Sequence, residues 1–450
     1  MPAERHTPLP KLTSPRRLDT IATKVRRIST LRNSAVESAA SPSVAVPTQS
    51  LYTPQIVALC VVGLLGFGSQ FLIQPILPIL VLERGGDATT VGLIIAAFSF
   101  PSVILRPFMG RLVDEWSNRH VLALGTGGIG LTGFLYLVPN LGAIFANRIL
   151  HGAAWSAFNA AGHSMVARLA PAGRRGEAAS VYVMMAGIAQ TVMPAIGLLL
   201  FGVTGTSGPF VLAAVMGIAA TAVIVLGPLP VLRPVAAPTR EGFWRSLFEP
   251  GAVVPMGLEF LFTSVSALFL IYPAIWATSR QIPLEQLALY YPVYGVVLVG
   301  LRLISGRYID RAPRRPVIAA GAGLAIVALV IAAGAQDVPM LTVGGAIYAA
   351  AASFTSPAAM AMAIDQSDPR RMGAAMATYT LGFQLALGVG AAIWGWMIDL
   401  YGYPAPYFAA LLVEVALLAV LGLSWYLRRG GGTSGAGGQN RAARAVDAGG

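Results

Sequence analysis

The chain has 450 residues, of which 56% are hydrophobic and only 11% are charged, and its mean hydropathy is +0.69. Charged residues make up about a quarter of an ordinary soluble domain, so this composition excludes one and places most of the chain in lipid. The formal net charge of +12 would suit a nucleic-acid binder, but the arginines fall between apolar segments and in the tails, without a basic aromatic groove, so we expect no nucleic-acid partner.

Twelve apolar segments follow a tail at residues 1–54, which is rich in Pro, Ser, Thr and Arg and predicts a disordered basic segment. Each segment has 20 to 28 residues, enough to cross a hydrocarbon core about 30 Å thick. The first bundle, 55–232, has segments at 55–82, 88–109, 119–138, 141–167, 178–203 and 209–232. After a linker at 233–250, the second bundle, 251–428, has segments at 251–277, 285–304, 316–335, 338–364, 372–399 and 403–427. The Gly-rich stretch 429–450 predicts a second disordered tail, so the fold class expected is an all-α membrane protein with twelve transmembrane helices in two six-helix bundles.

The two bundles carry the same motif at the same place. Gly-Arg-Leu-Val-Asp at 110–114 recurs as Gly-Arg-Tyr-Ile-Asp at 306–310, which is 196 residues later. An Arg-Arg pair at 174–175 recurs at 370–371 with the same offset. Two separated features that agree on one offset indicate a duplicated half.

The repeated loops are expected to act as gates. Their glycine allows two helices to approach closely, and their aspartate can accept hydrogen bonds from the N-terminus of a neighbouring helix and pair with an arginine. Such contacts form in one tilt of the bundles and break in the other, whereas membrane topology alone explains the arginines but not the repeated aspartate. The gating residues expected are Arg106, Gly110, Arg111, Asp114, Arg302, Gly306, Arg307, Asp310 and Arg311.

Basic residues also predict the orientation in the membrane. Eight of them lie in the first 54 residues, and nearly all the others fall in segments on the same side. The turns on the opposite side contain only Arg84 and Arg280. The positive-inside rule therefore predicts that both termini are cytoplasmic.

The paired loops at 110–114 and 306–311, set between the second and third helix of each half, resemble those of the major facilitator superfamily of secondary transporters. The likeness covers about residues 51–428. The first loop departs from the family pattern with Glu115 and Ser117, and the second with Pro313. The resemblance implies a monomer that moves a small-molecule solute through the lipid bilayer by alternating access and needs no cofactor.

The segment 141–167 carries a polar stripe. At about 100° per residue, Arg148, His151, Trp155, Asn159 and His163 share one face of a helix. An arginine facing lipid at this depth costs at least about 2.5–3.5 kcal/mol, so it should face a wet cavity, the alternative being that it reaches the outer interface. Arg148-x-x-His151-Gly152 also resembles the arginine motif of the family, which implies a role for this arginine in proton transfer or anion binding.

Two carboxylates lie inside apolar segments. Glu259 is in the first helix of the second half, which lines the cavity in the family, and we expect it to carry the coupled proton together with Arg148 and His151. Glu414 is in the last helix, where a supporting role is expected. Polar and aromatic residues expected to line the substrate cavity are Gln70, Gln74, Trp155, Asn159, Gln190, Tyr290, Tyr294, Tyr379 and Gln384.

The direction of transport is predicted from weaker signals. Pro194 and Gly197 keep part of an antiporter motif, although a packing kink explains them too. The stretch 106–177 resembles bacterial drug and sugar efflux permeases, which implies the inner membrane of a bacterium. Proton-coupled efflux is therefore predicted, with a proton-coupled uptake symporter or a transporter-like sensor as alternatives. The chain has no catalytic motif or acidic metal cluster and a single cysteine in an apolar run, Cys60, so neither an enzyme nor a metal site is expected.

Overall fold

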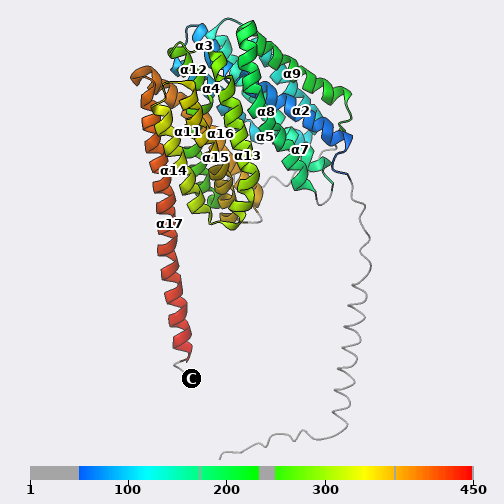
Figure 1. Cartoon of the computed structure of the whole chain (residues 1–450). Coiled ribbons are helices and arrows are strands. Elements are labelled where there is room, and N and C mark those ends of the chain that lie inside the picture. The colour runs from blue at the N-terminus through cyan, green and yellow to red at the C-terminus, as the bar shows by residue number, and fades with distance from the viewer. Residues whose placement is uncertain (1–49, 172–173, 233–248, 369–370, 448–450) are drawn as a thin grey trace, which may run out of the picture. The chain divides into compact units, whose positions relative to one another are not determined.

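The computed structural model describes residues 50–171, 174–232, 249–368 and 371–447, which form helices joined by short turns and contain no strand (Figure 1). The predicted tail at 1–49 and the linker at 233–248 lie outside the described residues. The side chains of Asp114, Arg307 and Asp310 also lie outside them. The predicted all-α fold class is confirmed for the described part of the chain.

Each predicted apolar segment coincides with one, two or, at 251–277, three consecutive helical elements. The N-terminal half, residues 50–232, contains α2 (Pro54–Ile73), α3 (Ile76–Glu83), α4 (Ala88–Ile104), α5 (Arg106–Glu115), α6 (Asn118–Leu135), α7 (Leu141–Leu169), α8 (Arg175–Thr204) and α9 (Ser207–Leu226). The C-terminal half, residues 249–447, contains η1 (Pro250–Ala252), α11 (Val253–Leu270), α12 (Pro273–Ser279), η2 (Leu284–Leu289), α13 (Tyr290–Arg311), α14 (Arg314–Ala333), α15 (Val338–Gln366), α16 (Met372–Tyr401) and α17 (Pro404–Asp447). Among the described residues nine helices are long and apolar enough to cross a membrane, and α4 is a shorter apolar helix. That measure supports nine of the twelve predicted crossings.

Prolines divide two of the segments that were expected to be single helices, and a third is divided at Leu105. Pro75 separates α2 from α3 and Pro273 begins α12, because proline has no N–H for the helical ladder and its ring crowds the preceding turn. These two breaks lie at equivalent places in the two halves. The break at Leu105, between α4 and α5, has no counterpart, since α13 runs unbroken through the equivalent positions.

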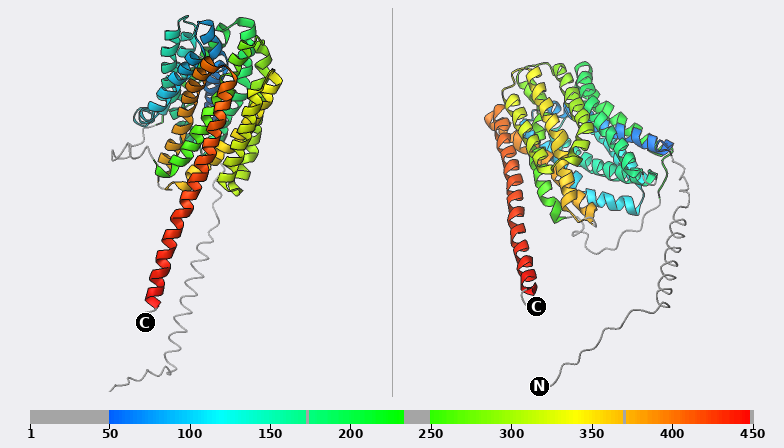
Figure 2. Two further views of the ribbon diagram at one scale, coloured as in Figure 1. Left: turned by 90° about the vertical axis from the view of Figure 1, so that its left-hand side faces the viewer. Right: turned by 60° about the horizontal axis from the view of Figure 1, so that its bottom comes forward.

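The last helix differs from the expectation. The sequence predicts a helix over 403–427 followed by a tail, but α17 extends from Pro404 to Asp447 and continues past the neighbouring helices (Figure 2). Glycine disfavours helix by about 1 kcal/mol relative to alanine, and this segment is rich in glycine. Nothing in its composition explains the helix.

The internal duplication extends to contacts between helix ends. In the N-terminal half, Arg168 at the end of α7 donates a 2.7 Å hydrogen bond to the side-chain oxygen of Asn118 at the start of α6. At the equivalent place in the C-terminal half, Arg314 at the start of α14 pairs with Asp365 near the end of α15, with 3.0 Å between Nε and Oδ2. The arginine belongs to α7 in the N-terminal half and to α14, the equivalent of α6, in the C-terminal half. In both halves an arginine side chain connects the two equivalent helices.

The two halves pack against each other through small residues. The helix α4 packs on α16, and α8 packs on α13. A Cβ on Gly92 would overlap the carbonyl of Ala391, and one on Gly395 would overlap the carbonyl of Ala88. Small residues are what allow membrane helices to approach this closely. These contacts lie at the end of the bundle where α3 and α12 come together (Figure 1), which we call the α3/α12 end.

Candidate functional site

A cavity of about 430 Å³ lies between the two halves. Helices α2, α3, α4, α5, α7 and α8 line it from one side, and α11, α13, α15 and α16 line it from the other. Both halves therefore supply its wall. Of the polar and aromatic residues predicted to line a cavity, those on this wall are Gln70, Gln74, Trp155, Asn159, Gln190, Tyr294 and Gln384.

Two tyrosines predicted for the cavity lie elsewhere. Tyr290 is fully buried in the packing of the C-terminal half, where its hydroxyl donates to the carbonyl of Phe269 at 2.7 Å. Tyr379 donates to the backbone carbonyl of Ser356 at 2.8 Å and is not part of the cavity wall. Helical spacing placed Tyr290 and Tyr294 on one face of α13, but only Tyr294 lies at the level of the cavity.

Arg148 lies on the cavity wall with its guanidinium buried. It donates to the hydroxyl of Tyr136 at 3.2 Å and to the carbonyl of Ile94 at 3.4 Å, and it lies 4.4 Å above the ring of Phe98. The Tyr136 hydroxyl is also 3.0 Å from Nδ1 of His151, which is buried behind the wall. Only 2% of Arg148 is exposed, so it does not reach an interface.

The sequence reasoning missed Tyr136. This tyrosine follows α6 in an apolar segment with no polar pattern around it, and 15 residues separate it from His151 along the chain. The only available signal was indirect: a buried arginine needs acceptors, and a tyrosine hydroxyl is one of the few that an apolar segment offers.

Glu259 lies directly behind the wall. Its Oε1 accepts 2.9 Å hydrogen bonds from the hydroxyls of Thr263 and Ser356, both of which line the cavity. Its Oε2 accepts no hydrogen bond of ordinary geometry from a described residue, although the Tyr379 hydroxyl lies beside the carboxylate, and the side chain is 1% exposed. Glu414 on α17 is also fully buried and is not on the wall. A shell of two hydroxyls therefore connects the carboxylate of Glu259, but not that of Glu414, with the cavity.

Two arginines predicted for the gating loops instead line the cavity. Arg106, the first residue of α5, and Arg302, on α13, are repeat-related positions of the two halves, and both are on the wall. Neither guanidinium makes a hydrogen bond or an ion pair within the part of the chain that the structure describes. With Arg148 they supply three arginines to a wall on which no described residue is Asp or Glu.

The glycines of the gating loops do not pack closely in this conformation. At Gly110 and at Gly306, no atom outside the helix lies within 4 Å of the position that a Cβ would take. The close approach expected at these loops is therefore absent there, and it occurs at the α3/α12 end. Arg111 and Arg311 are exposed, and the contacts of Asp114 and Asp310 fall outside the described side chains.

A carboxylate connects the halves at the α3/α12 end. Asp399 on α16 accepts hydrogen bonds from the backbone N–H groups of Ala88 at 3.1 Å and Thr89 at 2.6 Å, and from the Thr89 hydroxyl at 2.5 Å. Asp87, the N-cap of α4, accepts hydrogen bonds from the Thr90 hydroxyl at 2.6 Å and from the Thr90 N–H at 2.8 Å, and these two bonds hold the pKa of Asp87 below its usual value. The N–H groups in the first turn of α4 have no partner within the helix. One of them bonds to the N-cap Asp87, and two bond to Asp399 of the opposite half. Asp399 thus makes with the N-terminus of α4 the kind of contact that was expected of Asp114 and Asp310, whose side chains lie outside the described residues.

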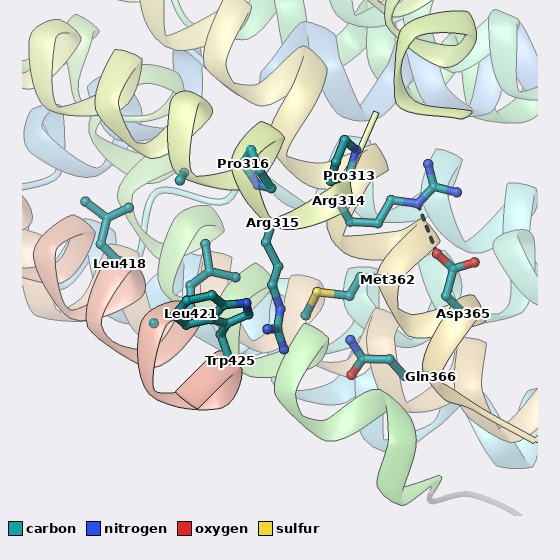
Figure 3. Close-up of a pocket in the computed structure, with 12 residues that line it drawn as sticks. Pro313, Arg314, Arg315, Pro316, Met362, Asp365, Gln366, Leu418, Leu421 and Trp425 are labelled. Carbon is teal, nitrogen blue, oxygen red and sulfur yellow. Dashed lines mark hydrogen bonds and ion pairs between the residues drawn. The ribbon is translucent and has the colours of Figure 1, made fainter. Parts of the chain in front are cut away.

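A second hollow lies on the C-terminal half alone. It is a surface groove of about 770 Å³ between α14, α15 and α17, with the Arg314–Asp365 ion pair at one edge and Trp425 of α17 at the other (Figure 3). The groove contains none of the residues predicted for a site. Arg315 also lines it, and this side chain donates to the carbonyl of Ser424 at 3.3 Å. Because only one half supplies its wall, a tilt between the halves would not open or close it.

Comparisons with known proteins give a consistent answer. The family model described as Major Facilitator Superfamily matches residues 59–333 and 260–447. The chain is 21% identical over 379 residues to the uncharacterized MFS-type transporter MJ1560 of Methanocaldococcus jannaschii, covering 81% of this chain and 95% of that protein. It is 26% identical over 365 residues to the uncharacterized MFS-type transporter YhhS of Salmonella typhi, covering 77% and 85%. A crystal structure of a variant of the nucleoside transporter NupG matches with a TM-score of 0.69 at 12% identity, covering 82% of this chain and 98% of that one.

Proposed function

Because the chain belongs to the major facilitator superfamily, we propose that this transporter moves a small organic solute across the inner membrane of a bacterium by proton-coupled alternating access. The cavity between the two halves is the observation that carries the proposal. A site with walls from both halves changes its access when the halves tilt against each other, which is how family members of this architecture work. Contacts between the halves at the α3/α12 end close that side.

The side opposite the α3/α12 end is the one that we propose to be open in this conformation. At Gly110 and Gly306, on that side, no atom outside the helix lies within 4 Å of the position that a Cβ would take, so the close contacts between the halves are missing there. The basic loops lie at this side, so the positive-inside rule assigns it to the cytoplasm. The conformation is then inward-open, with both termini in the cytoplasm.

Glu259 is the proposed proton carrier. A carboxylate held behind two hydroxyls is dry when the cavity is closed and exchanges protons when the cavity fills with water. Uphill transport needs such a difference, because a proton that binds both conformations equally shifts neither. Arg148 and His151, which are connected through the hydroxyl of Tyr136, are proposed to take part in proton coupling together with Glu259.

We propose export as the direction, on the resemblance of residues 106–177 to efflux permeases. Uptake with protons is the second candidate, and one observation favours it. Arg302 lines the cavity behind whose wall Glu259 lies, so a proton on Glu259 makes the net charge around the cavity more positive. A proton and a negatively charged solute would then bind together and move in the same direction.

The test begins with the solute. Metabolites released by cells with and without the protein are compared, and the solute found is sealed into proteoliposomes that contain the purified chain. An imposed pH gradient should drive the wild-type protein to concentrate the solute. Glu259→Gln should abolish this uphill movement and leave solute counterflow intact. Glu414→Gln is the matched control, a second buried carboxylate off the cavity wall, and should behave as the wild type.

Three outcomes would decide between the alternatives. If Glu259→Gln still concentrates the solute in response to a pH gradient, the proton passes elsewhere. Accumulation driven by a gradient of the opposite sign would replace export with uptake. Binding of the solute without counterflow would make the protein a sensor, because a transporter must exchange solute across the membrane.

A further inference from the structure

We propose that the cavity binds organic anions, meaning solutes that join a carboxylate, sulfonate or phosphate group to an apolar body. This inference rests on the proposed function and names its substrate class. Arg106 and Arg302 approach the cavity from opposite halves, and Arg148 adds a third guanidinium. Among the described residues that line the cavity, no side chain is negatively charged.

The charge balance favours an anion even when Glu259 is counted. That carboxylate is behind the wall, where the hydroxyls of Thr263 and Ser356 hold it, so at most it offsets one of the three arginines. Charges in a cavity with apolar walls are only weakly screened by water. A cation would meet a net positive charge in either protonation state of Glu259, and an anion would meet an attractive one.

Arg106 and Arg302 also have unused hydrogen-bonding capacity. Each guanidinium carries five N–H donors in a planar fork that matches the two oxygens of a carboxylate or the oxygens of a phosphate. Neither makes a hydrogen bond or an ion pair within the described part of the chain, whereas Arg148 already donates to Tyr136 and Ile94. Arg302 is exposed, so water serves its donors until an anion takes its place, whereas Arg106 is partly buried among apolar residues and a bound anion would offset the cost of its burial.

The repeat adds a reason why two separate arginines are needed. Arg106 belongs to the N-terminal half and Arg302 occupies the same position of the C-terminal half. An anion held by both would connect the halves across the cavity. Its binding would therefore depend on their relative tilt, and a ligand that prefers one tilt shifts the population of conformations.

The rest of the wall defines the body of the solute. Phe67 and Trp155 pack edge to face with 5.7 Å between ring centroids, and Phe262 and Phe383 extend the apolar surface on the other half. A volume of about 430 Å³ is in the range of sites for small organic ligands, which are mostly apolar with a few placed polar groups. An aromatic or aliphatic body with a single anionic group fits this wall.

The test compares three probes that share one ring system and differ in charge. They are 2-naphthalenesulfonate, its neutral sulfonamide, and the cationic 2-naphthylmethylammonium, titrated by calorimetry into the full chain in an uncharged detergent. The sulfonate should bind at least about 10-fold more tightly than the sulfonamide, because hydrogen bonds to a charged group discriminate by about that factor or more. Protein-free micelles give the background for each probe.

Substitutions should locate the binding to the two arginines. Arg106→Gln and Arg302→Gln should each weaken sulfonate binding by about 10-fold or more and leave sulfonamide binding unchanged. Arg302→Lys keeps the charge and should lose less affinity, which separates anion recognition from misfolding. Arg84→Gln, in the turn after α3, is the matched control and should bind the sulfonate as the wild type does.

The proposal is overturned if the sulfonate does not bind, if the sulfonamide binds equally well, if the ammonium compound binds more tightly, or if both glutamine variants bind the sulfonate normally. Its failure can be told apart from failure of the proposed function. Glu259-dependent accumulation of the ammonium compound would refute anion recognition and leave proton-coupled transport standing. Sulfonate binding that depends on both arginines, without counterflow in proteoliposomes, would support anion recognition and refute transport.

Discussion

Asp399 should hold the α3/α12 end closed. Its carboxylate accepts three hydrogen bonds from Ala88 and Thr89, the first residues of α4 in the opposite half, and all three must break when that end opens. Asp399→Asn removes the charge and one of the acceptor oxygens but keeps the shape of the side chain. Asp399→Ala removes all three bonds. We expect both variants to shift the protein towards the conformation that is open at this end.

The size of the shift follows from the contact. A carboxylate at a helix N-terminus contributes about 0.3–1 kcal/mol through the helix dipole, and a capping hydrogen bond about 0.5–2 kcal/mol. Asp399 is exposed, so solvent places the loss for Asp399→Asn towards the lower part of these ranges, near 1 kcal/mol. A change of that size alters the ratio of two conformations about five-fold.

Distances between spin labels measure this ratio directly. The single cysteine, Cys60, is replaced by serine, and labels are attached at positions 84 and 280, in the turns after α3 and α12. The wild type should give one short distance, and Asp399→Asn should add a longer one. Asp87→Ala is the control, because it removes a cap of α4 that comes from its own half. Identical distance distributions for the wild type and both Asp399 variants would refute the reasoning.

Two further predictions concern buried contacts. Tyr136→Phe removes the hydroxyl that accepts a hydrogen bond from Arg148, and a buried charged group without its acceptor costs about 1–3 kcal/mol. The midpoint of thermal unfolding in detergent should therefore fall. An unchanged midpoint would mean that water or another group replaces the hydroxyl. Gly92→Val places a methyl group against the carbonyl of Ala391, so the spin-label pair should report more of the conformation that is open at the α3/α12 end. A single short distance in that variant would show that α4 and α16 can separate locally without tilting the halves.

The sequence by itself determined the class of the protein. Apolar segments long enough to cross a bilayer can be recognised without any tertiary contact, because in lipid the backbone must satisfy its own hydrogen bonds and helices are the direct solution. The repeated motifs at 110–114 and 306–310 predicted two related halves, and a repeat can also be recognised without any tertiary contact. The polar stripe of α7 also followed from the sequence, since helical periodicity places residues on a common face. Arg148, Trp155 and Asn159 all lie on the cavity wall.

Only the tertiary structure decided which side chains share the cavity and which end of the bundle is closed. Periodicity gives the face of a helix but not its height relative to its neighbours, so Tyr290 was expected at a cavity that only Tyr294 reaches. Arg106 and Arg302 were assigned to the loops by their motif, but α5 and α13 bring them onto the wall. Asp399 showed no signal at all, because its partners at the start of α4 are about 310 residues away along the chain. A contact of that kind depends on how two independently formed bundles pack, and the local sequence around either residue carries no record of it.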